Sequence, residues 1–345
     1  MKKTLIIALL AAVFLSSCGE NKTEKTEGIK EEKVVNTDEN KDEHYPVTIK
    51  TYNSSGEEIE TVYEKAPEKV LAVYQGSIET MLELGLYDKL VAAAGLDNEV
   101  PENQKSDFEK VKYLDEFTPS LETVTMLEPD MIFSWGSLFG EKTLGEVNDW
   151  LDKKVNIYMN TNTHSSSVKP YNRTLENEFN DILNIGKIFN VEDKAEKIVN
   201  EMKSIIDDVS KKTKENDKKQ TVLILESTKD TFINYDNKSL GGDMVTKLGG
   251  ELAIKDSSKL GKEDIISANP DVIFVVYMPY DGDDEEQVKQ EKLDVYNDKA
   301  FSELNAVKNK RIIPIKLSEM YASATRTKDG IETFAKGLYP NLNEK

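Results

Sequence analysis

The chain has 345 residues, with 64 Asp and Glu against 45 Lys and Arg, which gives a formal net charge of −19 at pH 7. This excess of carboxylates repels phosphate backbones and anionic lipid head groups, so it argues against nucleic-acid partners and against a peripheral membrane-binding surface. The single cysteine and the two histidines argue against a disulfide framework and against a site that binds a bare transition-metal ion.

The first residues have the pattern of an export signal. Lys2 and Lys3 precede an apolar run over residues 5–15, which is shorter than the ~20 residues that span a bilayer. The run ends in Leu-Ser-Ser-Cys, a tetrad that resembles the lipobox of bacterial lipoproteins. The resemblance implies that residues 1–17 are a signal peptide and that Cys18 is lipidated and becomes the mature N-terminus. The alternative is an ordinary signal peptide with a chance cysteine.

Residues 18–44 are expected to form a disordered acidic tether. Residues 19–44 contain no aromatic side chain and only three larger aliphatic ones, so they cannot bury enough apolar surface to offset the loss of chain entropy. A flexible segment of this length reaches roughly 28 Å on average. Attachment would rest on the lipid alone, on the outer face of the cell membrane. That face is the extracellular side, or the periplasmic side if the host has an outer membrane.

Residues 45–173 are predicted to form an N-terminal α/β lobe. Short β-rich runs at residues 69–74, 90–94, 131–135 and 155–159 alternate with helical patterns such as residues 77–84. This order of elements predicts a parallel sheet covered by helices.

Residues 174–215 are predicted to be a helical connector, with a break near Asn190. A helix over residues 191–215 would measure roughly 37 Å, which is long enough to span two lobes. Three further β-rich runs follow at residues 221–226, 272–276 and 311–315. Residues 216–345 are therefore predicted to form a second α/β lobe, with a cleft between the two.

Two pieces of the first lobe recur in the second. Residues 79–85 (ETMLELG) match residues 243–249 (DMVTKLG) in spacing. Residues 124–133 (VTMLEPDMIF) match residues 265–274 (IISANPDVIF), with a shared Pro-Asp between helix and strand. Because the two matches occur in the same order, they indicate that the lobes are structurally related.

Five segments together resemble the substrate-binding proteins of ABC importers for iron-siderophores, haem and cobalamin. They are APEKVLAVYQGSIETMLELGLYDKLVAAAG, PSLETVTMLEPDMIFSW, GGDMVTKLGGELA, EDIISANPDVIFVV, and FSELNAVKNKRIIPI with the following RTKDGIETFAKGLYP. The resemblance implies two Rossmann-like lobes with parallel sheets, joined by one long rigid α-helix. It also implies a monomer that binds a metal chelate in the cleft and delivers it to a membrane permease with its ATPase.

The resemblance further implies one docking carboxylate on each lobe, which pairs with arginines of the permease. By position these are Glu79 and Asp243. Each is expected at the start of a short helix, where the helix dipole favours a carboxylate. Asp243 departs from the family pattern, which usually has the longer glutamate. The alternative is that both residues are ordinary first-turn caps.

Candidate ligand contacts follow from the rule that ligands sit beyond the carboxyl ends of the strands in open α/β sheets. Aromatic side chains suit a bulky, partly apolar chelate, and a guanidinium suits an oxygen-rich one. The alternatives are ordinary edge packing for the aromatic residues and a structural ion pair for the arginine. The candidates are Tyr74, Gln75, Trp135, Tyr235, Tyr277, Tyr280, Tyr321 and Arg326.

The predicted function is binding rather than catalysis, because no Gly-x-Ser-x-Gly, Walker or dinucleotide motif is present. The expected cargo is an iron(III)-siderophore or a similar metal chelate, and we expect no cofactor apart from this cargo. One alternative is the same scaffold holding a corrinoid or haem, with His164 or Tyr277 as a possible axial ligand. An alternative of another class is a surface sensor or adhesion lipoprotein.

Overall fold

The computed structural model describes residues 44–165, 171–213, 219–280 and 282–341. The predictions for the signal peptide, for Cys18 and for all of the tether except His44 lie outside these residues. In the described ranges, no helix is both long enough and apolar enough to cross a membrane.

The described part begins with a β-hairpin that the sequence analysis did not anticipate. Strands β1 (Val47–Tyr52) and β2 (Glu58–Tyr63) pair antiparallel. Burial alternates along β1, so that Val47, Ile49 and Thr51 face inward. The hydroxyl of Thr51 accepts a hydrogen bond from the backbone of Met159 at 3.1 Å. This contact attaches the hairpin to the last strand of the first sheet.

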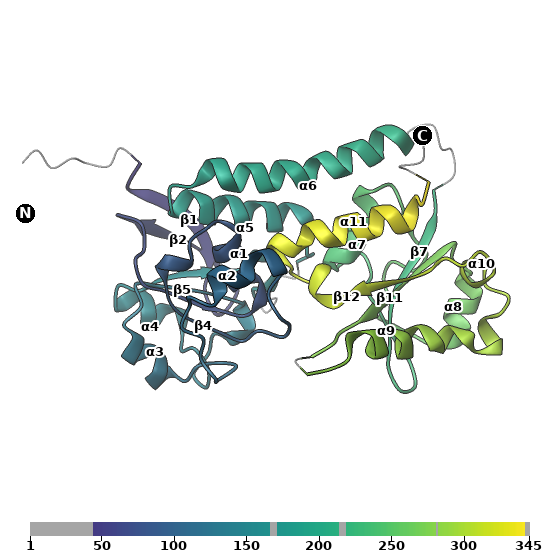
Figure 1. Cartoon of the computed structure of the whole chain (residues 1–345), viewed down its shortest axis with the longest axis horizontal. Coiled ribbons are helices and arrows are strands. Elements are labelled where there is room, and N and C mark those ends of the chain that lie inside the picture. Colours follow the sequence, from purple (N-terminus) through teal and green to yellow (C-terminus); the bar gives the residue numbers. More distant parts are fainter. Residues whose placement is uncertain (1–43, 166–170, 214–218, 281, 342–345) are drawn as a thin grey trace, which may run out of the picture. The chain divides into compact units, whose positions relative to one another are not determined.

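The first sheet is fully parallel, as predicted. Its order is β4 (Leu90–Ala94), β3 (Val70–Val73), β5 (Met131–Ser134) and β6 (Asn156–Met159). Every residue of β3 and β5 is buried, because apolar side chains pack against both faces of a parallel sheet. The helices of this lobe are α1 (Gln75–Glu83), α2 (Lys105–Phe108), α3 (Leu121–Leu127) and α4 (Val147–Asp152) (Figure 1).

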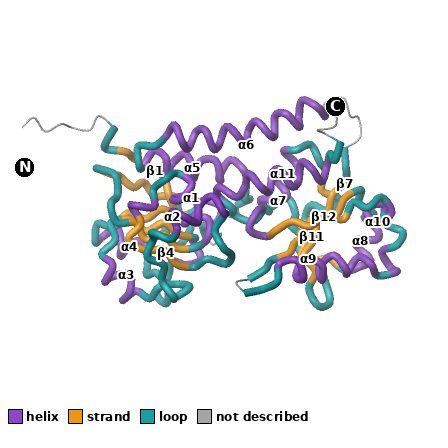
Figure 2. The backbone as a smooth tube through the Cα atoms, in the orientation of Figure 1, coloured by secondary structure: helices purple, strands orange, loops and turns teal. Residues whose placement is uncertain are grey.

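The connector consists of two packed helices, α5 (Leu175–Ile188) and α6 (Glu192–Thr213). The predicted break is confirmed, because Asn190 has a φ of 55°, in the left-handed region that ends a helix. Gly186 allows the close approach of the two helices, since a Cβ there would lie 2.4 Å from the Cβ of Ala195. Helices α5, α6 and α11 (Thr327–Leu338) lie along one side of both sheets (Figure 2).

The second sheet has the order β10-β8-β7-β11-β12, and β9 also pairs with β7. Strands β7 (Thr221–Ser227), β11 (Val272–Tyr277) and β12 (Ile312–Lys316) are parallel, as predicted, and so is the short β9 (Glu251–Leu252). Strand β8 (Phe232–Asn234) pairs antiparallel with β7 on one side and with β10 (Lys259–Leu260) on the other. The sheet is therefore mixed, because the short turn after β7 can only form a hairpin.

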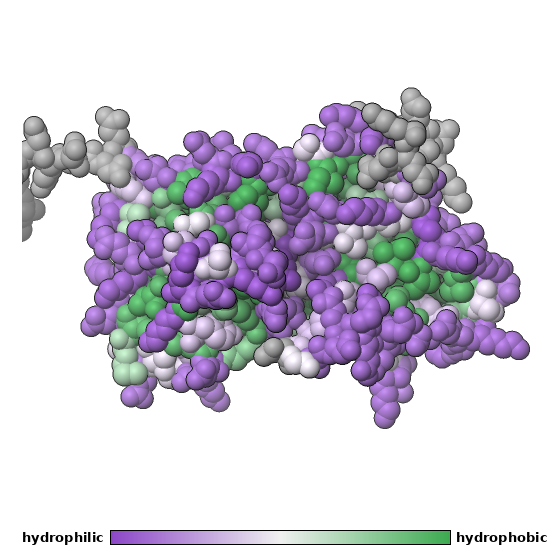
Figure 3. Space-filling view, viewed as in Figure 1, coloured by the Kyte–Doolittle hydropathy of each residue, from purple (hydrophilic) through white to green (hydrophobic). Residues whose placement is uncertain are grey.

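The helices of the second lobe are α7 (Leu240–Lys247), α8 (Lys262–Ala268), α9 (Glu285–Asp294) and α10 (Asn305–Lys308). Hydrophilic side chains cover most of the face shown in Figure 3, including α9, in keeping with the acidic composition.

The predicted repeat has a structural basis in the shared Pro-Asp. Helices α3 and α8 both end at a residue with left-handed φ, namely Glu128 at 48° and Asn269 at 40°. The carboxylate of Asp130 then accepts hydrogen bonds from the backbone of residues 68 and 69, just before β3. The carboxylate of Asp271 accepts one from the backbone of Thr221, at the start of β7. In both lobes the aspartate thus ties its strand to the neighbouring one.

Candidate functional site

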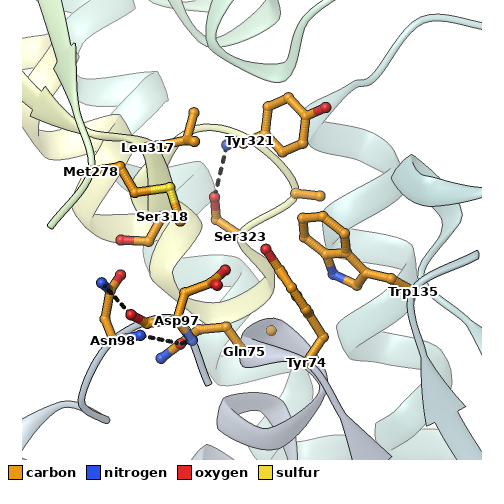
Figure 4. Close-up of a pocket in the computed structure, with 12 residues that line it drawn as sticks. Tyr74, Gln75, Asp97, Asn98, Trp135, Met278, Leu317, Ser318, Tyr321 and Ser323 are labelled. Atoms are coloured by element: carbon orange, nitrogen blue, oxygen red, sulfur yellow. Dashed lines mark hydrogen bonds between the residues drawn. The ribbon is translucent and has the colours of Figure 1, made fainter. Parts of the chain in front are cut away.

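A cavity lies between the two lobes. Its walls come from the segments that follow β3, β4 and β5 in the first sheet and β11 and β12 in the second. The cavity therefore lies at the carboxyl ends of the strands, where ligands bind in open α/β sheets. The lining residues are Tyr74, Gln75, Gly76, Asp97, Asn98, Trp135, Met278, Leu317, Ser318, Tyr321, Ala322 and Ser323 (Figure 4).

Three aromatic side chains form one wall of this cavity (Figure 4). The ring centroids of Tyr74 and Trp135 lie 3.9 Å apart, and those of Trp135 and Tyr321 lie 6.0 Å apart. Trp135 Nε1 is buried without a hydrogen-bond partner among the described residues. Tyr74 has a φ of 82°, a strained conformation for a bulky residue of the kind that concentrates at functional sites. The wall combines apolar surface with an unused donor.

The opposite side of the cavity is polar and joins the lobes. The Gln75 side-chain oxygen accepts hydrogen bonds from the backbone of Asp97 and Asn98, at 3.0 and 3.1 Å. The Asn98 amide in turn donates to the carbonyl of Pro279 in the second lobe. Asn98 Oδ1 and Ser318 Oγ are buried without a partner among the described residues.

Asp97 is the one carboxylic acid among the lining residues. Its side chain points into the cavity, toward the hydroxyl of Tyr74 (Figure 4). Burial raises the pKa of Asp97, and a hydrogen bond from Tyr74 opposes that rise. Burial, together with Asp97, also raises the pKa of Tyr74, so this hydroxyl stays protonated and can donate.

Four of the predicted contacts line the cavity together, namely Tyr74, Gln75, Trp135 and Tyr321. Their contact with a ligand stays a prediction. The other predicted tyrosines do not line it. The hydroxyl of Tyr235 donates to Glu226 at 2.8 Å, and that of Tyr277 donates to Glu285 at 3.1 Å. Tyr280 is 60% exposed. Strand-end position alone does not decide which way these side chains turn.

Arg326 does not line the cavity, so its predicted placement is wrong. Its Nε lies 2.7 Å from Glu79 Oε2, and its Nη2 lies 2.6 Å from Glu79 Oε1. The guanidinium also donates to the backbone carbonyl of Glu99 at 2.7 Å. This geometry is the structural ion pair that the sequence analysis left as the alternative.

The expected exposure of Glu79 is also wrong. The side chain is 0% exposed, and the residue is the fifth of α1 rather than a member of its first turn. Burial raises the pKa of Glu79, and hydrogen bonds from Arg326 and Gln75 oppose the rise. The sequence repeat located Glu79 on a helix but not on its inward face. A carboxylate in this position is not accessible to a permease.

Asp243 lies in the first turn of α7, as predicted, and is partly exposed. Its Oδ2 accepts a hydrogen bond from the backbone of Leu175, the first residue of α5, at 2.8 Å. The carboxylate therefore caps the connector. This role inside the protein does not favour docking.

The sequence analysis missed several residues that shape the cavity. Asp97 and Asn98 follow β4, and Ser318 follows β12, so the strand-end rule could have found them. Arg173 gave no such signal, because it lies just before α5. Its guanidinium carbon lies 3.9 Å from the ring centroid of Tyr321, close enough for a cation–π contact.

His164 is enclosed by aromatic rings. It stacks on Tyr52 at 4.1 Å and on Tyr171 at 3.8 Å, and burial lowers the pKa of its ring. It is not among the residues that line the cavity. In the described residues, no group of three or more His, Cys, Asp and Glu is arranged to hold a metal ion.

A sequence model of the family described as periplasmic binding protein matches residues 70–317. The chain belongs to this family. The matched range contains the cavity wall from Tyr74 to Leu317 and leaves out the segment that carries Tyr321.

Curated relatives of this periplasmic binding protein come from Bacillus subtilis. The chain is 27% identical to the uncharacterised ABC transporter substrate-binding lipoprotein YvrC, over 96% of this chain and 95% of the relative. It is also 27% identical to the petrobactin-binding protein YclQ, over 96% of this chain and 100% of the relative.

Solved structures share the two-lobe fold. A periplasmic binding protein from Veillonella parvula is 29% identical, with a TM-score of 0.79 over 86% of this chain and 92% of that one. An Fe³⁺-hydroxamate transport protein from Saccharomonospora viridis is 19% identical, with a TM-score of 0.64 over 85% of this chain and 99% of that one. The latter likeness shows the fold alone.

Proposed function

We propose that this periplasmic binding protein captures a metal chelate, foremost an iron(III)-siderophore complex, and delivers it to an ABC permease with its ATPase. The observation that carries the proposal is the cavity between the lobes, with its aromatic wall and its unpartnered polar atoms. Aromatic faces suit the apolar parts of a chelate, and the indole N–H of Trp135 suits its oxygen atoms. The printed name of the relative YclQ, petrobactin-binding protein, supports this class of cargo.

A corrinoid is the second candidate, and haem is less favoured. The two residues considered as axial haem ligands, His164 and Tyr277, do not line the cavity. The Tyr277 hydroxyl donates a hydrogen bond to Glu285, and the His164 ring stacks between two tyrosines. A corrinoid brings its own metal and ring donors, so it needs only the aromatic and polar surface that the cavity offers.

The protein acts by binding rather than by catalysis, and it needs no cofactor besides its cargo. The lining residues that the structure describes include one carboxylic acid and no histidine, lysine or cysteine. The names of the relatives, a substrate-binding lipoprotein and a petrobactin-binding protein, support this proposal. Because the relative YvrC is named a lipoprotein, we place this protein on the outer face of the cell membrane, anchored through Cys18.

Docking to the permease calls for an exposed carboxylate on each lobe. The repeat that pairs residues 124–133 with 265–274 also pairs Glu122 with Glu263, two residues earlier in each lobe. Both are exposed in the first turns of α3 and α8. As exposed carboxylates they suit docking better than Glu79, which is buried, and Asp243, which is hydrogen-bonded to the backbone of Leu175. We propose Glu122 and Glu263 as the docking pair.

The absorbance spectrum of the protein purified from its native host tests the proposed cargo. A charge-transfer band in the visible region would identify a ferric siderophore, and a corrinoid band would identify the second candidate. A Soret band would identify haem and contradict the preference for a siderophore or a corrinoid over haem. Protein that carries no chelate, and binds none when titrated with ferric siderophores and corrinoids, would refute the proposed function.

A further inference from the structure

The charge of the cavity wall restricts the chemistry of the cargo. Among the twelve described residues that line the cavity, Asp97 alone is an acid, and there is no Lys, Arg or His. The remaining polar groups are neutral donors and acceptors, including the free Nε1 of Trp135 and Oγ of Ser318. A wall of this kind offers hydrogen bonds to a ligand but no direct counter-charge to an anion.

The cations near the cavity are already engaged. Arg326 is paired with Glu79, and Lys316, at the end of β12, is paired with Glu285 at 2.9 Å. Arg311 directly precedes β12, at the end of that strand away from the cavity, and donates to the backbone carbonyls of Gly337 and Leu338 at the end of α11.

Arg173 is the remaining arginine of the described residues; it contacts Tyr321 but is not itself a lining residue. Its guanidinium carbon lies 3.9 Å from the ring centroid, while the lining residue is the tyrosine. One guanidinium stacked on this ring offsets at most the single charge of Asp97. The net charge of the lining residues and Arg173 together is therefore close to zero.

The surroundings add negative charge. The segment after the lining residue Met278 leads into Asp283, Asp284, Glu285 and Glu286, and Glu319 directly follows the lining residue Ser318. Of these, the structure pairs Glu285 with Lys316 and Glu286 with Lys289. An approaching polyanion would meet carboxylates at the cavity and beside it, and the formal net charge of −19 for the whole chain adds to the repulsion.

We infer that this cleft selects chelates without net negative charge and discriminates against polyanionic ones. Three hydroxamates neutralise the charge of one iron(III) ion, and cyanocobalamin is neutral overall, so both classes fit. Three catecholates leave a net charge of −3 on the same ion, which nothing on the cavity wall balances. The inference rests on the proposed function and narrows its cargo.

Calorimetric titration of the full chain in a neutral detergent tests this inference. The probes are ferrioxamine E (a cyclic ferric trihydroxamate without net charge), cyanocobalamin and ferric enterobactin (a ferric tricatecholate). We expect one neutral probe to bind at least tenfold more tightly than the tricatecholate, since one unbalanced charge in a partly buried site is worth about that factor. The two neutral probes distinguish a siderophore from a corrinoid. The difference in affinity between the neutral probe and the tricatecholate should decrease when NaCl is raised from about 20 mM to about 500 mM, because salt screens charge repulsion.

Asp97→Asn removes the charge and keeps the shape of the side chain. It should tighten binding of the tricatecholate relative to the neutral probe, by up to about tenfold. The matched control is Asp152→Asn, which removes an equal charge from an exposed residue at the end of α4 that does not line the cavity. This control should leave the ratio of the affinities unchanged.

The outcomes separate the inference from the proposed function. Tricatecholate binding as tight as that of the neutral probes would overturn the inference and leave the proposed function standing. An equal effect of Asp97→Asn on charged and neutral probes would also overturn it, because Asp97 would then act through hydrogen bonding alone. Binding of none of the three probes would refute the proposed function and the inference together.

Discussion

Glu79 and Arg326 form a two-point ion pair that connects helix α1 of the first lobe to the start of α11 in the second. The carboxylate is 0% exposed and the guanidinium 10% exposed, and the two residues are 247 positions apart in the chain. Next to this pair, Glu178 of the connector accepts a hydrogen bond from the backbone of Ala324. The C-terminal segment is thus held against the first lobe by two buried carboxylates, which restrains movement between the lobes.

Removing one partner of this pair should destabilise the protein strongly. Glu79→Ala leaves the Arg326 guanidinium buried without its counter-ion, at an expected loss of about 3–5 kcal/mol in the free energy of unfolding. Urea unfolding followed by circular dichroism measures it. The double variant Glu79→Leu with Arg326→Met should lose less, because no charge stays buried. If the Glu79→Ala variant is fully stable but fails in uptake, Glu79 would instead be a residue that docks to the permease.

Asp181 of α5 should make stability depend on pH. It accepts hydrogen bonds from the hydroxyl of Tyr158 at 2.8 Å and from the hydroxyl of Thr161 at 2.6 Å. Burial and the neighbouring Glu178 raise its pKa from 3.8 to about 7. A carboxyl whose pKa is higher in the folded than in the unfolded state binds more protons when folded. The contribution of this carboxyl to the free energy of unfolding is complete below about pH 4 and declines as the pH rises toward 7.

Asp181→Asn should remove this pH dependence. Between about pH 5 and pH 8 we expect the wild type to lose about 2–3 kcal/mol more than the variant in the free energy of unfolding. Glu178 is present in both proteins, so the difference isolates Asp181. Urea unfolding at several pH values gives the free energy of unfolding of both proteins. An equal dependence on pH in the two proteins would contradict the role assigned to Asp181.

The two tryptophans allow a matched test of the aromatic wall. Trp135→Phe keeps an aromatic face but removes the unpartnered Nε1, so it should weaken chelate binding by about 0.5–1.5 kcal/mol with little loss of stability. Trp150→Phe is the control, because Trp150 Nε1 donates to the carbonyl of Leu144 at 2.6 Å, away from the cavity. It should lower stability and leave affinity unchanged. Isothermal titration and thermal unfolding of both variants measure this, and unchanged affinity in Trp135→Phe would remove the indole from the binding site.

Glu122 and Glu263 should matter for transport and not for capture. Replacing both by alanine should abolish uptake of the chelate into cells, because docking requires both lobes at once and each contact raises the effective concentration of the other. Chelate affinity should not change, since neither residue lines the cavity. Parallel uptake and titration measurements on one variant check this. Normal uptake by the double variant would contradict the docking pair.

The order of the elements could be read from the sequence because it depends on local patterns. The buried strands β3, β5 and β11 appear as short apolar runs, and the left-handed Asn190 appears as a break in a helical pattern. The strand-end rule likewise placed Tyr74 and Trp135 at the cleft, since the carboxyl ends of parallel strands share one edge of the sheet. The shared Pro-Asp predicted the relation between the lobes, because Asp130 and Asp271 perform the same local task.

The tertiary structure alone decided which charged residues are exposed and which are paired. From sequence, Glu79 and Glu122 are both acidic residues on short helices, yet one is buried against Arg326 and the other is exposed. Arg326 was expected at the cavity but is paired with Glu79 instead, for the same reason. An ion pair forms between residues far apart in the chain when two lobes close on each other, and no local pattern records it. Composition and periodicity determine that a lobe folds, whereas the packing between lobes determines which of its charges remain available to a ligand or a partner.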